Sequence, residues 1–116
     1  MDLEKIKLKL KEFAEERDWE QFHDPKNLSM ALSVEVAELV EIFQWSKTGG
    51  LDEIKNPKTR KEIEKEIADI FNYLIKLVDL LDMDLEKAAL EKIEENANKY
   101  PVLKVKGIAV KHSKIK

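Results

Sequence analysis

The segment from Leu28 to Trp45 constrains the fold more than any other part of the chain. It reads LSMALSVEVAELVEIFQW and is apolar on nearly every side, with Glu35, Glu38 and Glu41 embedded in it. Glycine and proline are scarce in the chain, so long helices are expected. A helix that is apolar almost all round needs more cover than three partners in a small bundle usually give. We therefore expect a homodimer, or a dimer of dimers, with this helix near the interface. The alternative is a monomer in which this helix is central.

A second helical stretch carries Glu66 and Asp69 at the same three-residue step that separates Glu35 from Glu38. This step places each pair on one stripe of its helix. Burying four anions costs several kcal/mol each unless a cation neutralises them. Neither stretch offers matching arginines, so a divalent metal ion is the simplest source of positive charge.

Spacing alone is weak support for a metal site, because 39% of the residues are charged. Glu91 and Glu94 show the same step by chance, but their neighbours are polar, which is typical of a solvated helix face. Glu35 and Glu38 instead lie among valine, alanine and leucine. Context therefore separates the metal hypothesis from ordinary surface charge.

The periodicity predicts an all-α protein, a four-helix bundle that assembles as a homo-oligomer. Asn27 or Ser29 is expected to cap the second helix, whereas Asn56 followed by Pro57 begins the third and Asp84 caps the fourth. The expected helices cover residues 2–17, 28–45, 57–81 and 85–99. We expect residues 1–101 to form the helical domain and residues 102–116 to form a basic tail.

Composition excludes several classes of function. A net charge of −3 is too mild to indicate a nucleic-acid or membrane partner, and the absence of cysteine excludes disulfides and thiolate ligands. The N-terminal residues alternate charged with apolar side chains, unlike a signal peptide or a membrane span, so a cytoplasmic location is expected. The tail carries five lysines and no acid. It is interpreted as a solvated end, as an arm on a neighbouring subunit, or as an attractor of anionic nucleotides.

Paired carboxylates from two helices form an all-oxygen site, which suits Mg²⁺ or Mn²⁺. Iron in helical bundles needs a Glu-x-x-His pair, and the histidines of this chain fall in an expected loop and in the tail. Magnesium held by a few carboxylates is a common arrangement for gripping a polyphosphate. Aromatic residues could then stack a base and lysines could meet phosphate, although Trp45 could instead be core and Lys92 could be solvated.

The residues also carry a resemblance to a known family. Residues 13–45, FAEERDWEQFHDPKNLSMALSVEVAELVEIFQW, resemble the core of the MazG-like all-α nucleoside triphosphate pyrophosphohydrolases, and within them the dCTP pyrophosphatase branch. The family pattern is two acids three apart, a gap, and Glu-x-x-Asp. The matching residues here are Glu35, Glu38, Glu66 and Asp69. The match continues through DIFNYL at 69–74 and ends around NANKYP at 96–101.

The resemblance implies Mg²⁺-dependent hydrolysis of a (deoxy)nucleoside triphosphate to the monophosphate and pyrophosphate, with dCTP-like pyrimidine or modified nucleotides as substrates. It implies that the four acids hold the ion, and Glu38 and Glu41 are both candidates for the general base. It also implies that neighbouring subunits share one site. The implied substrate contacts are Trp19, Trp45 and Tyr73 for base and sugar, and Lys92 and Asn96 for phosphate or sugar.

One position departs from the pattern: Leu10 stands where the dCTP branch has a histidine in the nucleotide pocket. The resemblance therefore leaves the base preference open. Two other functions stay open as well. One is a phosphoribosyl-ATP-type pyrophosphohydrolase, against which the tryptophan-rich loop argues. The other is a non-catalytic dimeric adaptor whose acids are surface charge.

Overall fold

The computed structural model describes all residues, 1–116, and every regular element in it is helical. The chain divides into two compact units, Met1–Asp82 and Met83–Lys116, which are described separately. The first unit holds α1 (Leu3–Glu16), α2 (Pro25–Phe43) and α3 (Pro57–Leu80), together with the short 3₁₀ turns η1 (Glu20–Phe22) and η2 (Glu53–Lys55). The prediction of an all-α protein is confirmed.

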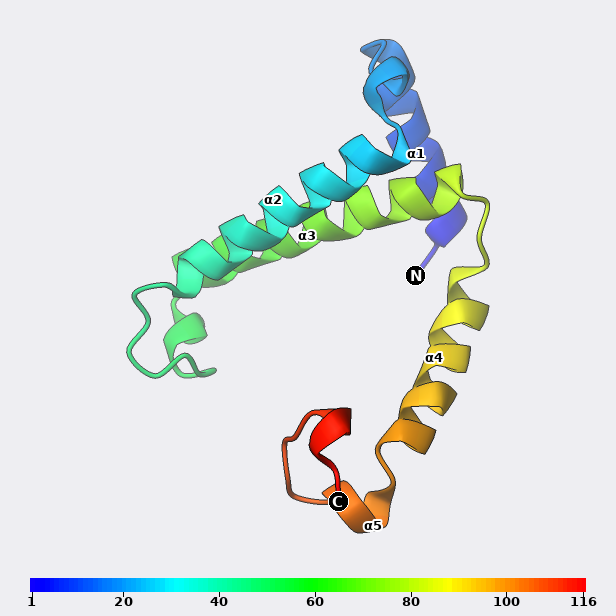
Figure 1. The fold of residues 1–116 in the computed structure, drawn as a ribbon. Coiled ribbons are helices and arrows are strands. Elements are labelled where there is room, and N and C mark those ends of the chain that lie inside the picture. The colour runs from blue at the N-terminus through cyan, green and yellow to red at the C-terminus, as the bar shows by residue number, and fades with distance from the viewer. The chain divides into compact units, whose positions relative to one another are not determined.

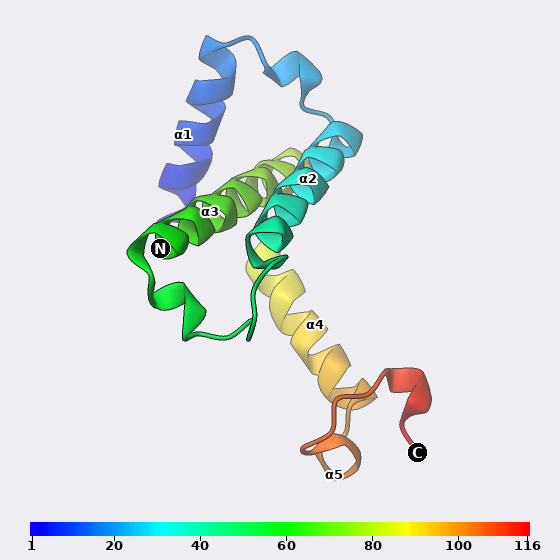
Figure 2. The same cartoon turned by 90° about the vertical axis from the view of Figure 1, so that its left-hand side faces the viewer.

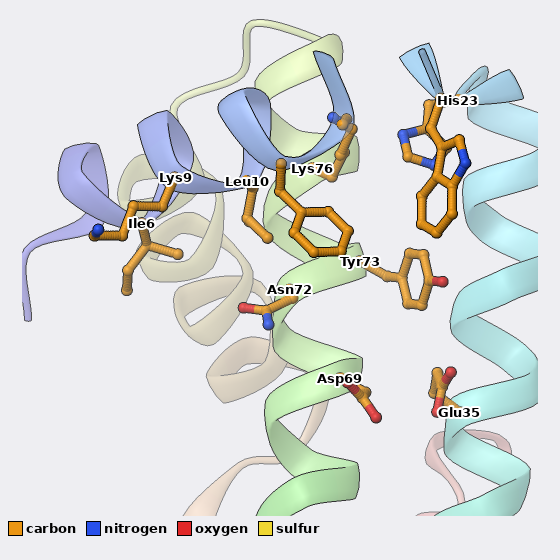
Figure 3. Close-up of a pocket in the computed structure, with 12 residues that line it drawn as sticks. Ile6, Lys9, Leu10, His23, Glu35, Asp69, Asn72, Tyr73 and Lys76 are labelled. Carbon is orange, nitrogen blue, oxygen red and sulfur yellow. The ribbon is translucent and has the colours of Figure 1, made fainter. Parts of the chain in front are cut away.

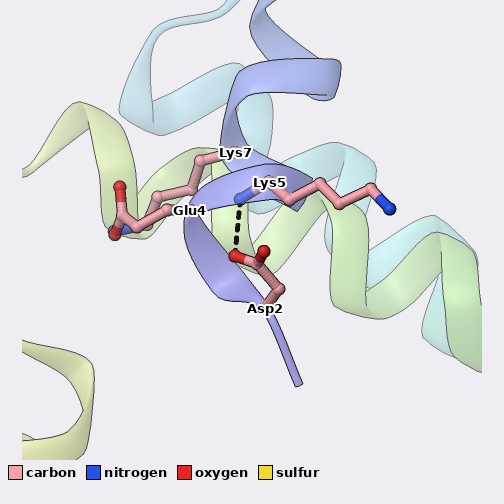
Figure 4. A network of polar contacts seen from close by, with 4 residues as sticks. All are labelled: Asp2, Glu4, Lys5 and Lys7. Carbon is pink, nitrogen blue, oxygen red and sulfur yellow. Dashed lines mark hydrogen bonds and ion pairs between the residues drawn. The ribbon is translucent and has the colours of Figure 1, made fainter.

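Each long helix begins at a side chain that caps its free N–H groups. At the start of α1, Asp2 Oδ1 accepts a hydrogen bond from the Lys5 N–H at 3.0 Å (Figure 4). At α3, Asn56 Oδ1 accepts from the Lys58 N–H at 2.9 Å, and Pro57 occupies the first turn, where it needs no donor. The predicted start of the third helix is confirmed.

The predicted start of the second helix is wrong. The cap is Asp24, whose Oδ1 accepts from the Asn27 N–H at 2.7 Å, and α2 begins at Pro25 rather than after Asn27 or Ser29. The physical reason is the one that holds for the third helix: an acceptor side chain followed by proline at the first helical position. The Asp24-Pro25 pair, which precedes the start expected from the sequence, is therefore the actual helix start.

The first unit is built around the pairing of α2 with α3. The two helices run side by side in opposite directions, as both views show, and α1 crosses the C-terminal half of α3 (Figures 1 and 2). Fully buried side chains come from all three helices, namely Ala14, Leu28, Ile75 and Val78. This small core fixes the end of the unit at which α1 and α3 meet.

The connection between α2 and α3 is organised by Glu53. Its carboxylate accepts hydrogen bonds from the N–H groups of Lys47 and Thr48, at 2.9 and 3.0 Å, and from the Ser46 hydroxyl. These donors, with Ser46 the largest cause, lower the pKa of Glu53. Gly49 supplies the left-handed turn with φ +67°.

The second unit holds α4 (Leu85–Lys99), α5 (Val102–Val105) and a final 3₁₀ turn, η3 (His112–Lys114). Asp84 caps α4 as predicted, accepting from the Lys87 N–H at 3.0 Å. The tail is partly helical, and its His112 ring lies 6.1 Å from Tyr100 at the end of α4.

Three of the four expected long helices thus lie in the first unit and the fourth lies in the second. The bundle of four and the division of the chain at residue 101 stay predictions. None of the helices combines the length with the apolar character that crossing a membrane requires.

Candidate functional site

Three of the four expected metal ligands come together between α2 and α3. Carboxylate oxygens of Glu35, Glu38 and Glu66 all lie within 4.8 Å of one another. The three-residue step of α2 turns Glu35 and Glu38 toward the same neighbour, and the antiparallel pairing brings Glu66 of α3 opposite them. We call these three residues the carboxylate cluster.

The cluster carries negative charge without a partner. One oxygen of Glu35 and one of Glu66, Oε2 in each case, are shielded from solvent and have no hydrogen-bond donor. Burial raises the pKa of Glu35 to about 7, and the neighbouring Glu38 and the charge of Asp69 add to the shift. The pKa of Glu66 is raised by burial first and by Glu38 next. Orphaned carboxylate oxygens of this kind fit a hard divalent cation such as Mg²⁺ or Mn²⁺.

The fourth expected ligand, Asp69, lies one turn further along α3. Figure 3 shows its carboxylate and that of Glu35 pointing toward each other across the space between α2 and α3. Its negative charge is among the causes that raise the pKa of both Glu35 and Glu66. Asp69 is therefore next to the carboxylate cluster, although it is not one of the three residues whose oxygens converge most closely.

A cavity of about 550 Å³ opens beside the acids. Glu35 and Asp69 line one part of it, and Tyr73 projects into it from α3 (Figure 3). Its other lining residues come from α1, from η1 and its flanks, and from α3: Ile6, Lys9, Leu10, Phe13, Ala14, Trp19, His23, Asn72 and Lys76. The cavity is therefore acidic at one end and aromatic at the other.

The chain reversal after α1 brings Trp19 into this cavity. Asp18 adopts a left-handed conformation with φ +53°, which aspartate tolerates better than most residues. The Trp19 N–H then donates to the Ala14 carbonyl at 2.9 Å. The indole meets the Phe13 ring edge-to-face with centroids 5.7 Å apart, and the Arg17 guanidinium lies 3.7 Å from the centre of the Phe13 ring. The expected base-stacking residue is thus held by its neighbours.

Just after Trp19, an ion pair links η1 to α3. The ammonium group of Lys76 on α3 lies 4.0 Å from the carboxylate of Glu20 in η1. His23, at the end of the same segment, has a shielded Nδ1 without a hydrogen-bond partner. Burial lowers the pKa of His23, the positive charge of Lys76 lowers it further, and Glu20 opposes both. The imidazole is therefore neutral at pH 7.

A second, more open cavity of about 390 Å³ borders the carboxylate cluster. It is lined by Glu38, Glu41, Ile42, Glu62 and Glu66. Glu41, one of the two candidate general bases, thus shares this cavity with two members of the cluster. Glu62 also contributes here, although the sequence did not single it out as a site residue.

Comparison with known proteins places these residues in a family. The model of the MazG-like family matches residues 30–115, which include all four expected metal ligands. The chain belongs to the MazG-like family. The resemblance stated from the sequence is therefore confirmed.

Individual relatives of this MazG-like chain support the same family assignment. It is 43% identical over 112 residues to dCTP pyrophosphatase 1 of Mus musculus, covering 96% of this chain and 66% of the mouse protein. It is 45% identical over 101 residues to dCTP pyrophosphatase 1 of Homo sapiens, covering 85% of this chain and 59% of the human protein. The chain thus spans 59% to 66% of the length of these relatives, which is less than two thirds. Among solved structures it is similar to a pyrophosphatase from Archaeoglobus fulgidus, with a TM-score of 0.76 and 40% identity over 87% of this chain and 94% of that one.

Three expected substrate contacts of the MazG-like chain lie outside the cavities. Trp45 follows the end of α2, is 86% exposed and lines neither cavity. Lys92 and Asn96 are exposed residues of α4 in the second unit. The Lys92 ammonium lies 3.2 Å from Glu95 of its own helix. The roles of these three residues stay predictions.

Two lining residues were not predicted as part of the site, although the sequence offered a signal for them. Asn72 and Lys76 follow Asp69 on α3 at steps of three and seven, so they share its stripe. Both line the larger cavity.

Proposed function

We propose that this protein is a Mg²⁺-dependent nucleoside triphosphate pyrophosphohydrolase. It would hydrolyse (deoxy)nucleoside triphosphates, and in particular pyrimidine or modified nucleotides of the dCTP type, to the monophosphate and pyrophosphate. One observation carries the proposal: Glu35 belongs both to the carboxylate cluster and to the wall of the aromatic cavity. The carboxylate cluster would therefore bind the metal-triphosphate group, and the adjoining cavity would bind the base. The relatives, which include dCTP pyrophosphatases and a pyrophosphatase, support the same reaction.

The residues proposed to hold Mg²⁺, or Mn²⁺ in its place, are Glu35, Glu38, Glu66 and Asp69. The orphaned oxygens of Glu35 and Glu66 support this assignment. When bound, such an ion would neutralise charge on the triphosphate and make the α-phosphorus more electrophilic. Proton release from Glu35 would accompany binding, because its pKa of about 7 leaves it partly protonated at neutral pH.

Hydrolysis requires water to attack the α-phosphorus while the bond to the bridging oxygen of the pyrophosphate breaks. The water must lose a proton, and Glu38 and Glu41 are the candidate bases. Glu41 is better suited, because it lies on the second cavity but outside the carboxylate cluster, so its oxygens are not needed to hold an ion. Glu38 has two other carboxylates within 4.8 Å and is better suited to ligation.

The aromatic end of the cavity would hold the base and sugar. Trp19 and Tyr73 line it and offer stacking surfaces. Trp45 is 86% exposed, so it is free to reach a nucleotide bound by a second subunit. Lys92 and Asn96 complete the proposed set as contacts to phosphate or sugar.

The proposed assembly is a homodimer or a dimer of dimers. Apolar residues of α2 support it: Met30, Val34 and Val40 are 57%, 55% and 62% exposed. A globular protein rarely leaves several large apolar side chains of one helix uncovered. Light scattering coupled to size-exclusion chromatography would measure the mass directly, and a monomer at micromolar concentration would contradict this part of the proposal.

The decisive experiment incubates the protein with each common nucleoside triphosphate and Mg²⁺ and measures pyrophosphate and monophosphate release. Glu38→Gln serves as the active-site variant, and Glu91→Gln is its matched control, because Glu91 and Glu94 have the same spacing on an exposed face. The proposal predicts release by the wild type and the control, and none by Glu38→Gln. Orthophosphate as the product, or equal activity in Glu38→Gln, would overturn it.

The same assay separates the two alternatives. Activity on phosphoribosyl-ATP alone would indicate the histidine-pathway type of pyrophosphohydrolase. Absence of hydrolysis and of any Mg²⁺-dependent change in melting temperature would indicate a non-catalytic adaptor. The cytoplasmic location expected from the N-terminal sequence stays a prediction.

A further inference from the structure

The turn after α1 holds a residue in a strained conformation directly before Trp19. Asp18 has φ +53°, in the left-handed region where a helix usually ends on glycine. Its N–H donates to the Glu15 carbonyl at 3.1 Å, and the Trp19 N–H donates to the Ala14 carbonyl at 2.9 Å. These two bonds form the Schellman pattern that closes the C-terminus of a helix. The direction of the chain at Trp19 therefore depends on the conformation of Asp18.

The same turn orients the Trp19 side chain. In a Schellman motif, the residue after the left-handed position often packs an apolar side chain against the last turns of the helix. Here that residue is Trp19, whose indole meets the Phe13 ring edge-to-face with centroids 5.7 Å apart. Trp19 also lines the larger cavity. The turn thus positions an aromatic surface that the proposed function assigns to the base.

The side chain of Asp18 is fixed in turn by Gln21. The amide nitrogen of the Gln21 side chain donates to the Asp18 carbonyl oxygen and to its carboxylate Oδ2, both at 3.0 Å. Both acceptors belong to one residue, so the contact restrains the backbone of Asp18 as well as its side chain. Glycine would adopt the left-handed conformation with less strain, but it would offer no carboxylate to Gln21. We call Asp18 and Gln21 the turn clamp.

A second left-handed aspartate provides a comparison. Asp82 follows the end of α3, has φ +49° and donates its N–H to the Asp79 carbonyl at 3.1 Å. The residue three positions after Asp82 is Leu85, whose side chain cannot donate a hydrogen bond as Gln21 does. A left-handed aspartate can therefore end a helix without a clamp. This comparison indicates that the turn clamp has a role beyond the closure of α1.

Resting on the proposed function, we propose that Asp18 is a positioning residue, which together with Gln21 holds the Trp19 indole in the orientation that stacks on the base. Neither Asp18 nor Gln21 lines the larger cavity, so both act through Trp19 rather than on the nucleotide. A stacking group that is already held in place need not be ordered during binding, which strengthens the complex. Both hydrogen bonds of the clamp are exposed to solvent and contribute only modestly to the stability of the fold.

The test measures the affinity of the α,β-imido analogue of dCTP, with Mg²⁺, by calorimetry on the full chain. Asp18→Gly relieves the strain but removes the acceptor of the clamp, and Gln21→Ala removes its donor. Each variant should bind the analogue roughly two- to tenfold more weakly, since ordering one side chain at a binding site has about this effect. KM for dCTP should rise by the same factor with kcat unchanged, because stacking contributes equally to the ground and transition states.

Two control variants separate the orientation of Trp19 from general effects on the turn. Asp18→Asn keeps a side-chain acceptor and tolerates the left-handed conformation, so it should restore wild-type affinity. Asp82→Gly relieves the same strain at the end of α3 and should leave the affinity unchanged. A loss in Asp18→Asn equal to that in Asp18→Gly, or a comparable loss in Asp82→Gly, would overturn the inference.

A double-mutant cycle tests whether the clamp acts through the indole. Trp19→Ala removes the stacking surface, so adding Asp18→Gly to it should weaken binding no further. A further loss in the double variant would show that the clamp supports the cavity in another way, and the inference would fail.

Fluorescence reports on the orientation without nucleotide. The chain has two tryptophans, so Trp45→Phe leaves Trp19 as the single indole reporter. Time-resolved anisotropy of the free protein should show faster local motion of Trp19 after Asp18→Gly or Gln21→Ala, and no change after Asp82→Gly. Unchanged motion in both clamp variants would also contradict the inference.

The proposed function is tested separately, through pyrophosphate release by the wild type. Analogue binding that depends on the clamp, without any hydrolysis, would refute the enzyme and leave this inference standing. Hydrolysis with wild-type affinity in both clamp variants would do the reverse.

Discussion

Two pairs of glutamates with identical spacing behave differently in this molecule. Glu91 and Glu94 on α4 are exposed, and the next acid, Glu95, lies 3.2 Å from both Lys92 and Lys99. These lysines lower the pKa of Glu95, so α4 supplies its own counter-charge.

Glu35 and Glu38 on α2 face Glu66 and have no cation near them, and the pKa of Glu35 rises to about 7 through burial and neighbouring acids. A site is therefore marked by acids that lack a compensating charge, and spacing alone does not identify one.

The largest difference between the two pairs is expected when a proposed metal ligand is removed. Glu38→Gln is expected to lower the rate of pyrophosphate release by at least about a hundredfold, since even indirect support of a metal ligand has effects of this size. Glu91→Gln should retain the wild-type rate. Circular dichroism should show unchanged helicity in both, because neither side chain contributes to the core.

Mg²⁺ should stabilise the protein through Glu35 and Glu38, and Glu91 and Glu94 should play no part in this. At a free concentration one hundred times the dissociation constant, the ion adds about 2.7 kcal/mol to the free energy of unfolding. This corresponds to an increase in melting temperature of roughly 10 to 20 °C for a unit of this size. Differential scanning fluorimetry should show the increase in the wild type and in Glu91→Gln, and its loss in Glu38→Gln. A comparable increase in all three would place the ion elsewhere.

Without metal, the stability of the protein should depend on pH because of Glu35. A carboxyl group whose pKa is higher in the folded chain binds more protons when folded, so the free energy of unfolding falls as pH rises. The decrease should occur between the ordinary value of about 4.5 and about 7. Thermal melts in chelator across this range should show it, and Glu35→Gln should flatten the profile while Glu94→Gln leaves it unchanged.

The smallest effect is expected on α4. Glu95→Gln removes the acid that pairs with Lys92 and Lys99, and exposed ion pairs of this kind contribute little. The melting temperature should fall only slightly and the response to Mg²⁺ should not change. A large loss of the Mg²⁺ response would show that the acids of α4 also belong to a metal site.

Local rules were sufficient to predict much of the fold. The Asn56-Pro57 and Asp84 signals each satisfy the free N–H groups of a helix from adjacent residues, so they can be recognised without knowing the tertiary structure. The Asp24-Pro25 signal is equally local, since proline is harmless at the first helical position, but the expected caps Asn27 and Ser29 lie further along the chain.

The site could be predicted only in part, for physical reasons. Acids in an apolar helix can be recognised as site candidates from the sequence, because their burial is costly without a cation. Lys76 and Asn72 cannot be recognised in this way, since an amide or an ammonium group is common on the surface of a helix. Only the crossing of α1 over α3 makes these two residues part of a cavity. The role proposed for Trp45 would require a second subunit, whose position the sequence of one chain does not encode locally.

The double membership of Glu35 has a consequence for how ligands are taken up. One carboxylate belongs both to the carboxylate cluster and to the wall of the larger cavity. Whatever factor the ion adds to nucleotide affinity, the nucleotide must therefore add to ion affinity. A triphosphate without a metal ion would be repelled by the acids of the carboxylate cluster. An ion that binds without nucleotide would have to displace a proton from Glu35. Nucleotide and counter-ion should consequently bind as one complex in which the ion offsets part of the triphosphate charge, and the rate of hydrolysis should follow the concentration of this complex rather than that of either component.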